Sequence, residues 1–288
     1  MDILPQLIVN SIIAGSIYAV VALGFNLIYG TVKFFDIGFG AITAVGGYSV
    51  FFFYKKLGFE LFTSVFFGVI IAGAIGYLIY RLVYSPLRAR KAKNMVMLVA
   101  SLGSFIIVQA MVAMIFTSQF QTLSRSVGTQ RIYDIGGGVI TETQLVILIT
   151  AFVIMLLLSL FVEHTRNGKA IQAVADDEEV AKVVGVNTNK LIGLVFFIGS
   201  AIAGLAGILV GFDTGIEPTM GMALLLKGVV AAIIGGIGNI YGGVAGAFLL
   251  GFVENFGIWK ISGEWKDAIA FGLLIVFLLF RPQGIFKR

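Results

Sequence analysis

Residues 164–190 read HTRNGKAIQAVADDEEVAKVVGVNTNK, a polar stretch that separates two long apolar runs. Apolar runs of about 20 residues are typical of helices that span a bilayer. A charged stretch between two such runs has to lie in water on one side of the membrane. We therefore interpret residues 164–190 as a docking element, and the apolar runs around it as the walls of a conduit.

The composition excludes a soluble protein. The 288-residue chain is 59% hydrophobic and 12% charged, whereas soluble domains carry about 25% charged residues. The apolar runs are long and lack the alternation of barrel strands, which predicts an all-α polytopic membrane protein. No part of the chain has the composition of a separate soluble domain, so residues 1–288 are expected to form one membrane domain. In a membrane protein, the enrichment of cytoplasmic loops in Lys and Arg accounts for the net charge of +5 better than binding to nucleic acid does.

About nine membrane elements, with eight to ten as the range, are expected from the apolar runs. They fall at residues 6–29, 35–54, 61–82, 95–116, 143–163, 191–212, 223–238, 240–257 and 267–280. The last three are short and rich in glycine. Residues 117–142, with Gly136, Gly137 and Gly138, predict an irregular loop or a short hairpin.

The basic residues predict the orientation, because cytoplasmic loops are enriched in Lys and Arg. Thirteen fall on one side of the membrane: Lys33, Arg81, Arg88, Arg90, Lys91, Lys93, Arg166, Lys169, Lys182, Lys190, Arg281, Lys287 and Arg288. Six fall on the other: Lys55, Lys56, Arg125, Arg131, Lys260 and Lys266. This bias places the loop at residues 81–93, residues 164–190 and the C-terminus in the cytoplasm. With nine crossings, the N-terminus then lies outside.

Two short amphipathic helices are expected within residues 164–190. Ile171, Val174 and Ala175 share one face of the first helix. Asp176 is expected to cap the second helix and Gly185 to end it. The stretch contains no aromatic residue and its charge is nearly balanced, which favours docking to a protein over resting on lipid.

Two ionisable residues, Lys227 and Glu254, fall well inside apolar runs. Charges in a bilayer are costly, so each is a functional candidate, although a structural pair within the bundle is the favoured interpretation. Asp36, Asp213 and Glu217 lie near the ends of expected spans and are weaker candidates. A proton relay needs a longer series of such groups, which argues against a proton-coupled carrier.

Other chemistry is poorly supported. The run GGIGNIYGG at residues 235–243 lacks the Lys-Ser/Thr pair of a phosphate-binding loop, and it predicts a tight turn between two short helices. One histidine and no cysteine cannot form a zinc site. We therefore expect neither an enzyme nor a bound cofactor or metal.

The chain contains 37 glycines, and many small residues recur at four-residue spacing within the apolar runs. This spacing indicates close packing between helices.

Residues 165–187 resemble the cytoplasmic pattern TRxGRAIxAxAxDxExAxxxGINVxR of a known family. These are the permease subunits of high-affinity, binding-protein-dependent ABC importers of branched-chain amino acids. Residues 15–30, GSIYAVVALGFNLIYG, are similar to the family's GxxYALVALGLNLIYG. Residues 226–246 look like its LKxxVAxxxGGxGxxxGAxxG, and residues 281–286, RPQGIF, resemble its RPxGLFG. The resemblance runs from one end of the chain to the other.

The resemblance implies a type II ABC-importer-like permease in a bacterial or archaeal inner membrane. Two cytoplasmic ATPases would bind ATP and Mg²⁺, and a second, related permease and an extracytoplasmic solute-binding protein would complete the assembly. Alternating access would move solute through a cavity between the two permeases. The residues implied to couple with the ATPase are Arg166, Gly168, Ala170, Ala173, Asp177, Glu179, Ala181 and Gly185.

Two alternatives remain open at this point. Residues 36–40 read DIGFG where the family has an NFAHG-like motif, so urea, short amides or other amino acids stay possible as solutes. An ion-coupled secondary carrier would need ion ligands from broken helices, for which residues 213–242 are the plausible source. No substrate-contacting residue is assigned from the sequence.

Overall fold

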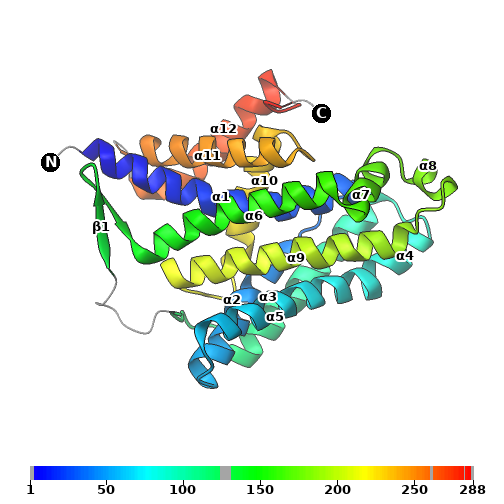
Figure 1. The fold of residues 1–288 in the computed structure, drawn as a ribbon, viewed down its shortest axis with the longest axis horizontal. Helices are drawn as coiled ribbons and strands as arrows, with labels where there is room; N and C mark the ends of the chain where they lie inside the picture. Colours follow the sequence, from blue (N-terminus) through cyan, green and yellow to red (C-terminus); the bar gives the residue numbers. More distant parts are fainter. Residues whose placement is uncertain (1–2, 124–130, 260–261, 282, 287–288) are drawn as a thin grey trace.

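The computed structural model describes residues 3–123, 131–259, 262–281 and 283–286, and these residues are mostly helical (Figure 1). The α-helices are α1 (Ile3–Val32), α2 (Gly38–Val50), α3 (Leu61–Ile79), α4 (Ser85–Ala89), α5 (Asn94–Phe116), α6 (Glu142–His164), α7 (Arg166–Asp176), α8 (Glu178–Val183), α9 (Thr188–Asp213), α10 (Met220–Gly235), α11 (Ile240–Gly257) and α12 (Lys266–Phe280). π-Helical turns extend α2 as η1 (Phe51–Lys56) and join α3 to α4 as η2 (Tyr80–Tyr84), and a 3₁₀ turn, η3 (Gly263–Trp265), precedes α12.

Six helices in the described part of the chain are long and apolar enough to cross a membrane. They are Ile3–Val32, Leu61–Ala89, Asn94–Phe116, Glu142–His164, Thr188–Asp213 and Ile240–Gly257. The other three expected positions hold α2, which η1 continues to Lys56, and the shorter helices α10 and α12, with 16 and 15 residues. A straight helix needs about 20 residues to span the hydrocarbon core, and length and apolar composition together support six of the nine expected spans.

Helix α1 forms the centre of the bundle. Its middle residues, Val20 to Leu23, are fully buried, and the helix packs against α6, α9, α10 and α11. Helices α3, α5 and α6 lie farther out and expose large apolar side chains, including Ile106, Met114 and Leu157. These outward apolar faces are what a bilayer covers, which agrees with a polytopic membrane protein.

Glycines bring α9 very close to its neighbours, as the small-residue spacing predicts. A Cβ atom built on Gly207 of α9 would lie 1.8 Å from the carbonyl oxygen of Thr43 in α2. A Cβ on Gly76 of α3 would lie 1.8 Å from Oγ of Ser200 in α9. The contact at Gly207 is with backbone, which cannot rotate away, so the spacing between α2 and α9 depends on that glycine.

Gly207→Ala is therefore expected to destabilise the bundle. Overpacking of a close contact costs about 1–3 kcal/mol, and the thermal unfolding midpoint in detergent should fall accordingly. Gly103→Ala in α5 is the matched control, because its Cβ would meet no atom within 4 Å. Equal midpoints for the two variants would show that α9 does not need this close approach.

The bundle has two distinct ends (Figure 1). At one end, strands β1 (Ile132–Ile135) and β2 (Gly138–Thr141) form an antiparallel hairpin, and Gln6 of α1 exchanges hydrogen bonds with the backbone of Val139. At the opposite end lie α7 and α8, and Phe286 donates its backbone N–H to Gly235. We call these the hairpin end and the α7–α8 end.

The hairpin confirms the structure predicted around Gly136–Gly138. Gly136 and Gly137, both with positive φ, make its two-residue turn. The predicted turn between two short helices is also confirmed: it joins α10 to α11 at residues 236–239. Four basic residues used for the orientation lie outside the described residues: Arg125, Lys260, Lys287 and Arg288.

Candidate functional site

The polar stretch folds into the two predicted helices, α7 and α8, between the ends of α6 and α9. The Oγ1 atom of Thr165 caps α7 by accepting the N–H of Gly168 at 2.9 Å. The predicted cap of α8 was wrong by one residue. Asp177, not Asp176, accepts the N–H groups of Glu179 and Val180, because Asp176 still belongs to the last turn of α7. Gly185, at φ +88°, follows the end of α8 as predicted.

One face of this segment is anchored in the bundle. Ile171, Val174 and Ala175 of α7 are buried, as is Ala181 of α8. Gly168 is buried against the last turn of α6, where a Cβ would lie 2.2 Å from the carbonyl oxygen of Phe161. The anchoring is apolar, so α7 is expected to move with α6, α1 and α9, which it contacts.

The opposite face is open to solvent. The eight coupling candidates divide between the two faces: Gly168 and Ala181 are buried, Ala170 is half-buried, and Arg166, Ala173, Asp177, Glu179 and Gly185 are exposed. Beside them, Val180, Val183 and Val184 are 59%, 87% and 72% exposed. We call these three valines the α8 valine patch. An apolar patch rimmed by charges at a helix tip is typical of a protein docking surface.

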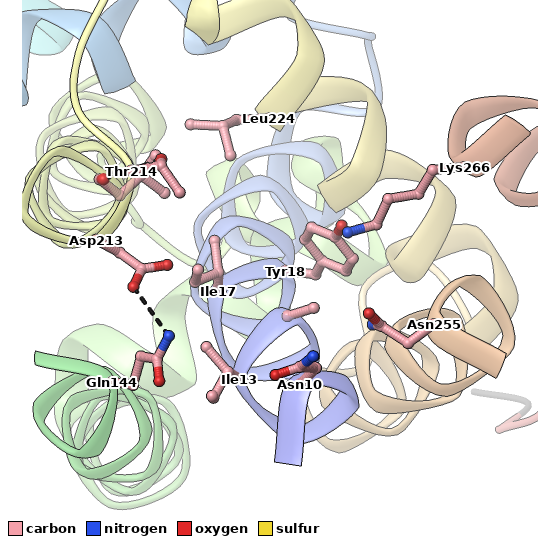
Figure 2. A pocket seen from close by; sticks show the side chains of 12 residues that line it. Asn10, Ile13, Ile17, Tyr18, Gln144, Asp213, Thr214, Leu224, Asn255 and Lys266 are labelled. Atoms are coloured by element: carbon pink, nitrogen blue, oxygen red, sulfur yellow. Dashed lines mark hydrogen bonds between the residues drawn. The ribbon is translucent and has the colours of Figure 1, made fainter. Parts of the chain in front are cut away.

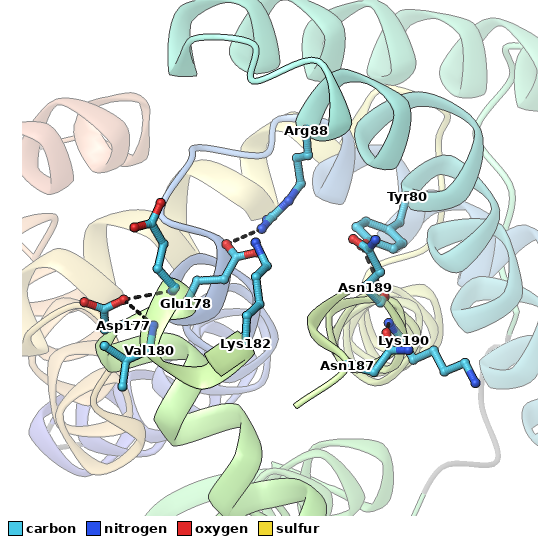
Figure 3. A network of polar contacts seen from close by, with 10 residues as sticks. Tyr80, Arg88, Asp177, Glu178, Val180, Lys182, Asn187, Asn189 and Lys190 are labelled. Atoms are coloured by element: carbon cyan, nitrogen blue, oxygen red, sulfur yellow. Dashed lines mark hydrogen bonds and ion pairs between the residues drawn. The ribbon is translucent and has the colours of Figure 1, made fainter. Parts of the chain in front are cut away.

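An ion-pair network ties α8 to α4 (Figure 3). Glu178 of α8 accepts a hydrogen bond of 2.5 Å from Arg88 of α4, and its other oxygen lies 2.8 Å from Nζ of Lys182. Partial burial alone would raise the pKa of the Glu178 carboxyl, but Lys182 and Arg88 outweigh it and lower the pKa below its usual value. The carboxylate therefore stays charged, and the network intact, at neutral pH.

Glu178→Gln is expected to loosen α8. The pair is partly exposed and contributes about 0.5–1 kcal/mol, so hydrogen exchange of residues 180–184 should speed up roughly two- to fivefold. Folding lowers the pKa of Glu178. The stability that the network adds is therefore complete at any pH above the pKa of Glu178 in the unfolded chain. It is lost only as the pH falls through the lowered pKa of the folded chain. The exchange difference between wild type and variant should therefore be constant from neutral to mildly acidic pH.

Glu179→Gln is the matched control, since Glu179 is exposed. If both variants exchange at the wild-type rate, the network does not hold α8.

The network continues into the bundle through η2, the π-helical turn next to α4. Tyr84 donates its hydroxyl to the buried carboxylate of Asp36 at 2.6 Å. Ser101 of α5 accepts the N–H of Ile37 just before α2. Tyr80 donates to the backbone oxygen of Asn189 in α9 at 3.2 Å (Figure 3). Contacts thus lead from α8 through α4 and η2 to α2 and α9.

These contacts explain the unusual motif at residues 36–40. Asp36 is 4% exposed and Phe39 is 1% exposed. A Cβ on Gly40 would lie 2.8 Å from the carbonyl oxygen of Gly221. The acid and the phenylalanine are therefore used in packing within this chain, where Tyr84 partners the acid.

Lys227 and Glu254 belong to a charge cluster shared by four helices. Lys227 of α10 pairs with Glu254 of α11, and its Nζ lies 2.8 Å from Oδ1 of Asp267 in α12. Glu254 is completely buried and accepts the hydroxyl of Tyr18 in α1 at 2.7 Å. Lys266 lies 3.8 Å from the same carboxyl group. The favoured interpretation of a structural pair agrees with this geometry.

A pocket of about 340 Å³ lies beside this cluster, toward the hairpin end (Figure 2). One face of α1 forms its floor, with Ile13, Ile17 and Tyr18. Asp213, at the end of α9, lies on one wall and receives a hydrogen bond from Gln144 at 3.3 Å. Lys266 lies on the opposite wall. The pocket is open, mostly apolar, and oppositely charged at its two sides.

Comparison with known proteins now identifies the family. The family described as "Branched-chain amino acid transport system / permease component" matches residues 7–278. The chain belongs to this permease family. It is 34% identical to the high-affinity branched-chain amino acid transport system permease protein BraD of Pseudomonas aeruginosa, over 98% of this chain and 95% of that protein. This confirms the resemblance found in the sequence.

Other relatives extend the match. The permease is also 34% identical to the LivH permease protein of Escherichia coli K12, with the same coverage of 98% and 95%. It is 24% identical to the probable LivH permease of Methanocaldococcus jannaschii, over 96% of this chain and 90% of that protein. Among solved structures, a chain of PsaBC from Streptococcus pneumoniae in complex with Fab has a similar fold, with a TM-score of 0.53, 13% identity, and coverage of 98% and 93%. Family membership and six long apolar helices indicate a multi-pass protein of the inner membrane.

Sequence reasoning missed several residues that the permease structure brings to these sites. Arg88 was counted only as a basic loop residue, yet it holds Glu178. Asn26 of α1 accepts the N–H of Gly238 and donates to the carbonyl oxygen of Asn239, which fastens the α10–α11 turn. An asparagine deep within a long apolar run was the available signal, because a buried amide needs partners.

Proposed function

We propose that this chain is the membrane-spanning permease subunit of an ATP-driven importer of branched-chain amino acids. Its membership of the permease family supports the proposal, as does its match to nearly the full length of BraD and LivH, which are named as high-affinity branched-chain amino acid permeases. The sequence contains no phosphate-binding loop of its own. ATP and Mg²⁺ would be bound by two partner ATPase subunits.

The observation that carries the proposal is the α7–α8 segment. It presents an exposed valine patch outward while its other face is anchored in the bundle. A partner that seats on the patch could push α8, and the contacts of Arg88 and Glu178 would pass that movement to α4. Helix α9 follows directly and packs through glycines on α2 and α3. Movement of these helices would open the conduit to one side at a time.

The proposed orientation follows from the same segment. The α7–α8 end would face the cytoplasm, where the ATPases lie, together with the C-terminus. The hairpin end and the N-terminus would face outward, where an extracytoplasmic solute-binding protein delivers its cargo. A second, related permease would pair with this chain, and the solute path would lie between them.

Uptake into proteoliposomes that contain this chain and its partner subunits tests the proposal. We expect uptake of radiolabelled L-leucine that requires ATP and the binding protein and persists when ion gradients are collapsed. Unlabelled isoleucine and valine should compete, whereas urea and acetamide should not. Uptake that follows an ion gradient without ATP would instead identify a secondary carrier. Competition by urea or acetamide alone would change the solute class.

A further inference from the structure

The pocket at the hairpin end combines features that suit one chemical class of ligand. Its volume of about 340 Å³ falls in the range of about 300–1,000 Å³ that is typical of small-molecule sites. Six helices, α1, α6, α9, α10, α11 and α12, supply its lining, so it is a feature of the folded bundle and not of a single loop. It lies within one chain.

Charge is distributed unevenly around this pocket. Asp213 supplies an anionic wall, and its carboxylate accepts a hydrogen bond from the side-chain amide of Gln144. Lys266 supplies a cationic wall across the floor formed by α1 (Figure 2). The Lys266 side chain is 35% exposed, and it stands 3.8 Å from Glu254, which is farther than a hydrogen bond. Its ammonium group therefore has hydrogen-bonding capacity left for a ligand.

Apolar side chains line the space between the two charges. Ile13 and Ile17 of α1 form one side, and Leu224 of α10 faces them (Figure 2). A ligand that fills this space has to present apolar surface to these side chains while it also meets a positive and a negative group. A sugar would place hydroxyl groups against isoleucine, and a simple ion would meet a wall of its own charge.

We propose that this pocket is a loading site for an amino acid zwitterion with an apolar side chain. The ligand's ammonium group is oriented toward Asp213, its carboxylate toward Lys266, and its side chain packs on Ile13, Ile17 and Leu224. This inference rests on the proposed function for the identity of the transported solute. The solute would bind here, inside one permease chain, before it enters the path between the two permeases.

Photolabelling of the full chain in lipid nanodiscs tests the site, with the diazirine analogue of L-leucine as the probe. We expect label on peptides of α1 that contain residues 10–18 and on α10 near Leu224, with protection by excess L-leucine. Asp213→Asn and Lys266→Gln should each reduce labelling roughly tenfold or more, as expected for loss of a charge-assisted contact. Glu217→Gln is the matched control, an exposed acid at the same end.

Competitors that carry one charge separate recognition from a general structural effect. 3-Methylbutylamine, which has only the ammonium group, should protect wild type and Lys266→Gln but not Asp213→Asn. 4-Methylpentanoate, which has only the carboxylate, should protect wild type and Asp213→Asn but not Lys266→Gln. A variant that merely misfolds would lose both kinds of protection.

The pocket assignment would be overturned by label on other helices or by no label at millimolar probe. It would also be overturned if each competitor protected wild type and both variants equally. The ATP-driven uptake assay distinguishes this failure from failure of the proposed function. Leucine uptake driven by ATP, with no label in the pocket, would reject this site and leave the function standing. Absence of ATP-driven leucine uptake would reject the function itself.

Discussion

Val183→Asp combined with Val184→Asp is expected to abolish copurification of the permease with its ATPase subunits. The two side chains are 87% and 72% exposed, so aspartate is readily hydrated there in the free chain. In a docked complex the same carboxylates would be buried against a partner without a countercharge, which costs several kcal/mol. A loss of association by at least 100-fold is expected, and ATP-driven uptake should disappear with it.

Copurification from detergent extracts and binding of the purified ATPase to nanodiscs would measure this effect. Val139→Asp is the matched control, because Val139 is 43% exposed at the hairpin end, far from the α8 valine patch (Figure 1). It should leave ATPase binding unchanged. If the double aspartate variant bound the ATPase as well as wild type, the valine patch would not be a docking surface.

Glu254→Leu is expected to destabilise the folded permease severely. Glu254 is completely buried and receives Lys227 and the Tyr18 hydroxyl. Its removal leaves Lys227, which is 12% exposed, with Asp267 as its remaining ion-pair partner among the residues that the structure describes. Breaking a buried pair from one side costs about 3–5 kcal/mol, so little folded protein should survive detergent extraction and the thermal midpoint should fall sharply.

The double variant Lys227→Met with Glu254→Leu should regain much of the lost stability, because it leaves no uncompensated charge. Asp267→Asn is the control for the exposed end of the cluster, since Asp267 is 74% exposed, and it should change the midpoint only slightly. A single Glu254→Leu variant as stable as wild type would show that the cluster is not a structural pair.

Several elements were predictable because their signals are local. The change from continuous apolar runs to a stretch with one apolar face marks α7 and α8, and Ile171, Val174 and Ala175 are all buried there. The glycine pair in the hairpin and the glycine-rich turn between α10 and α11 were predictable for the same reason. Small residues such as Gly207 also indicated close packing, although the partner helix could not be named.

Other features depend on contacts between distant parts of the chain. Two adjacent aspartates suit a helix cap equally well, and only the fold decides that Asp177 performs this role. Arg88 and Glu178 are 90 positions apart, and nothing near either residue points to the other. The pocket between Asp213 and Lys266 is formed by helices from both halves of the sequence. The number of crossings could not be predicted from the apolar runs either, because α10 and α12, with 16 and 15 residues, are shorter than a typical span.

Single-cysteine crosslinking measures most directly whether the α7–α8 segment receives the ATPase. The chain contains no cysteine, so Val183→Cys introduces a unique thiol at the exposed tip of α8. With a short thiol-to-lysine crosslinker in the assembled transporter, we expect a permease–ATPase adduct at Cys-substituted position 183, with a yield that changes when ATP is added. Val139→Cys should give no such adduct. An ATPase adduct from position 139 but none from position 183 would contradict the account.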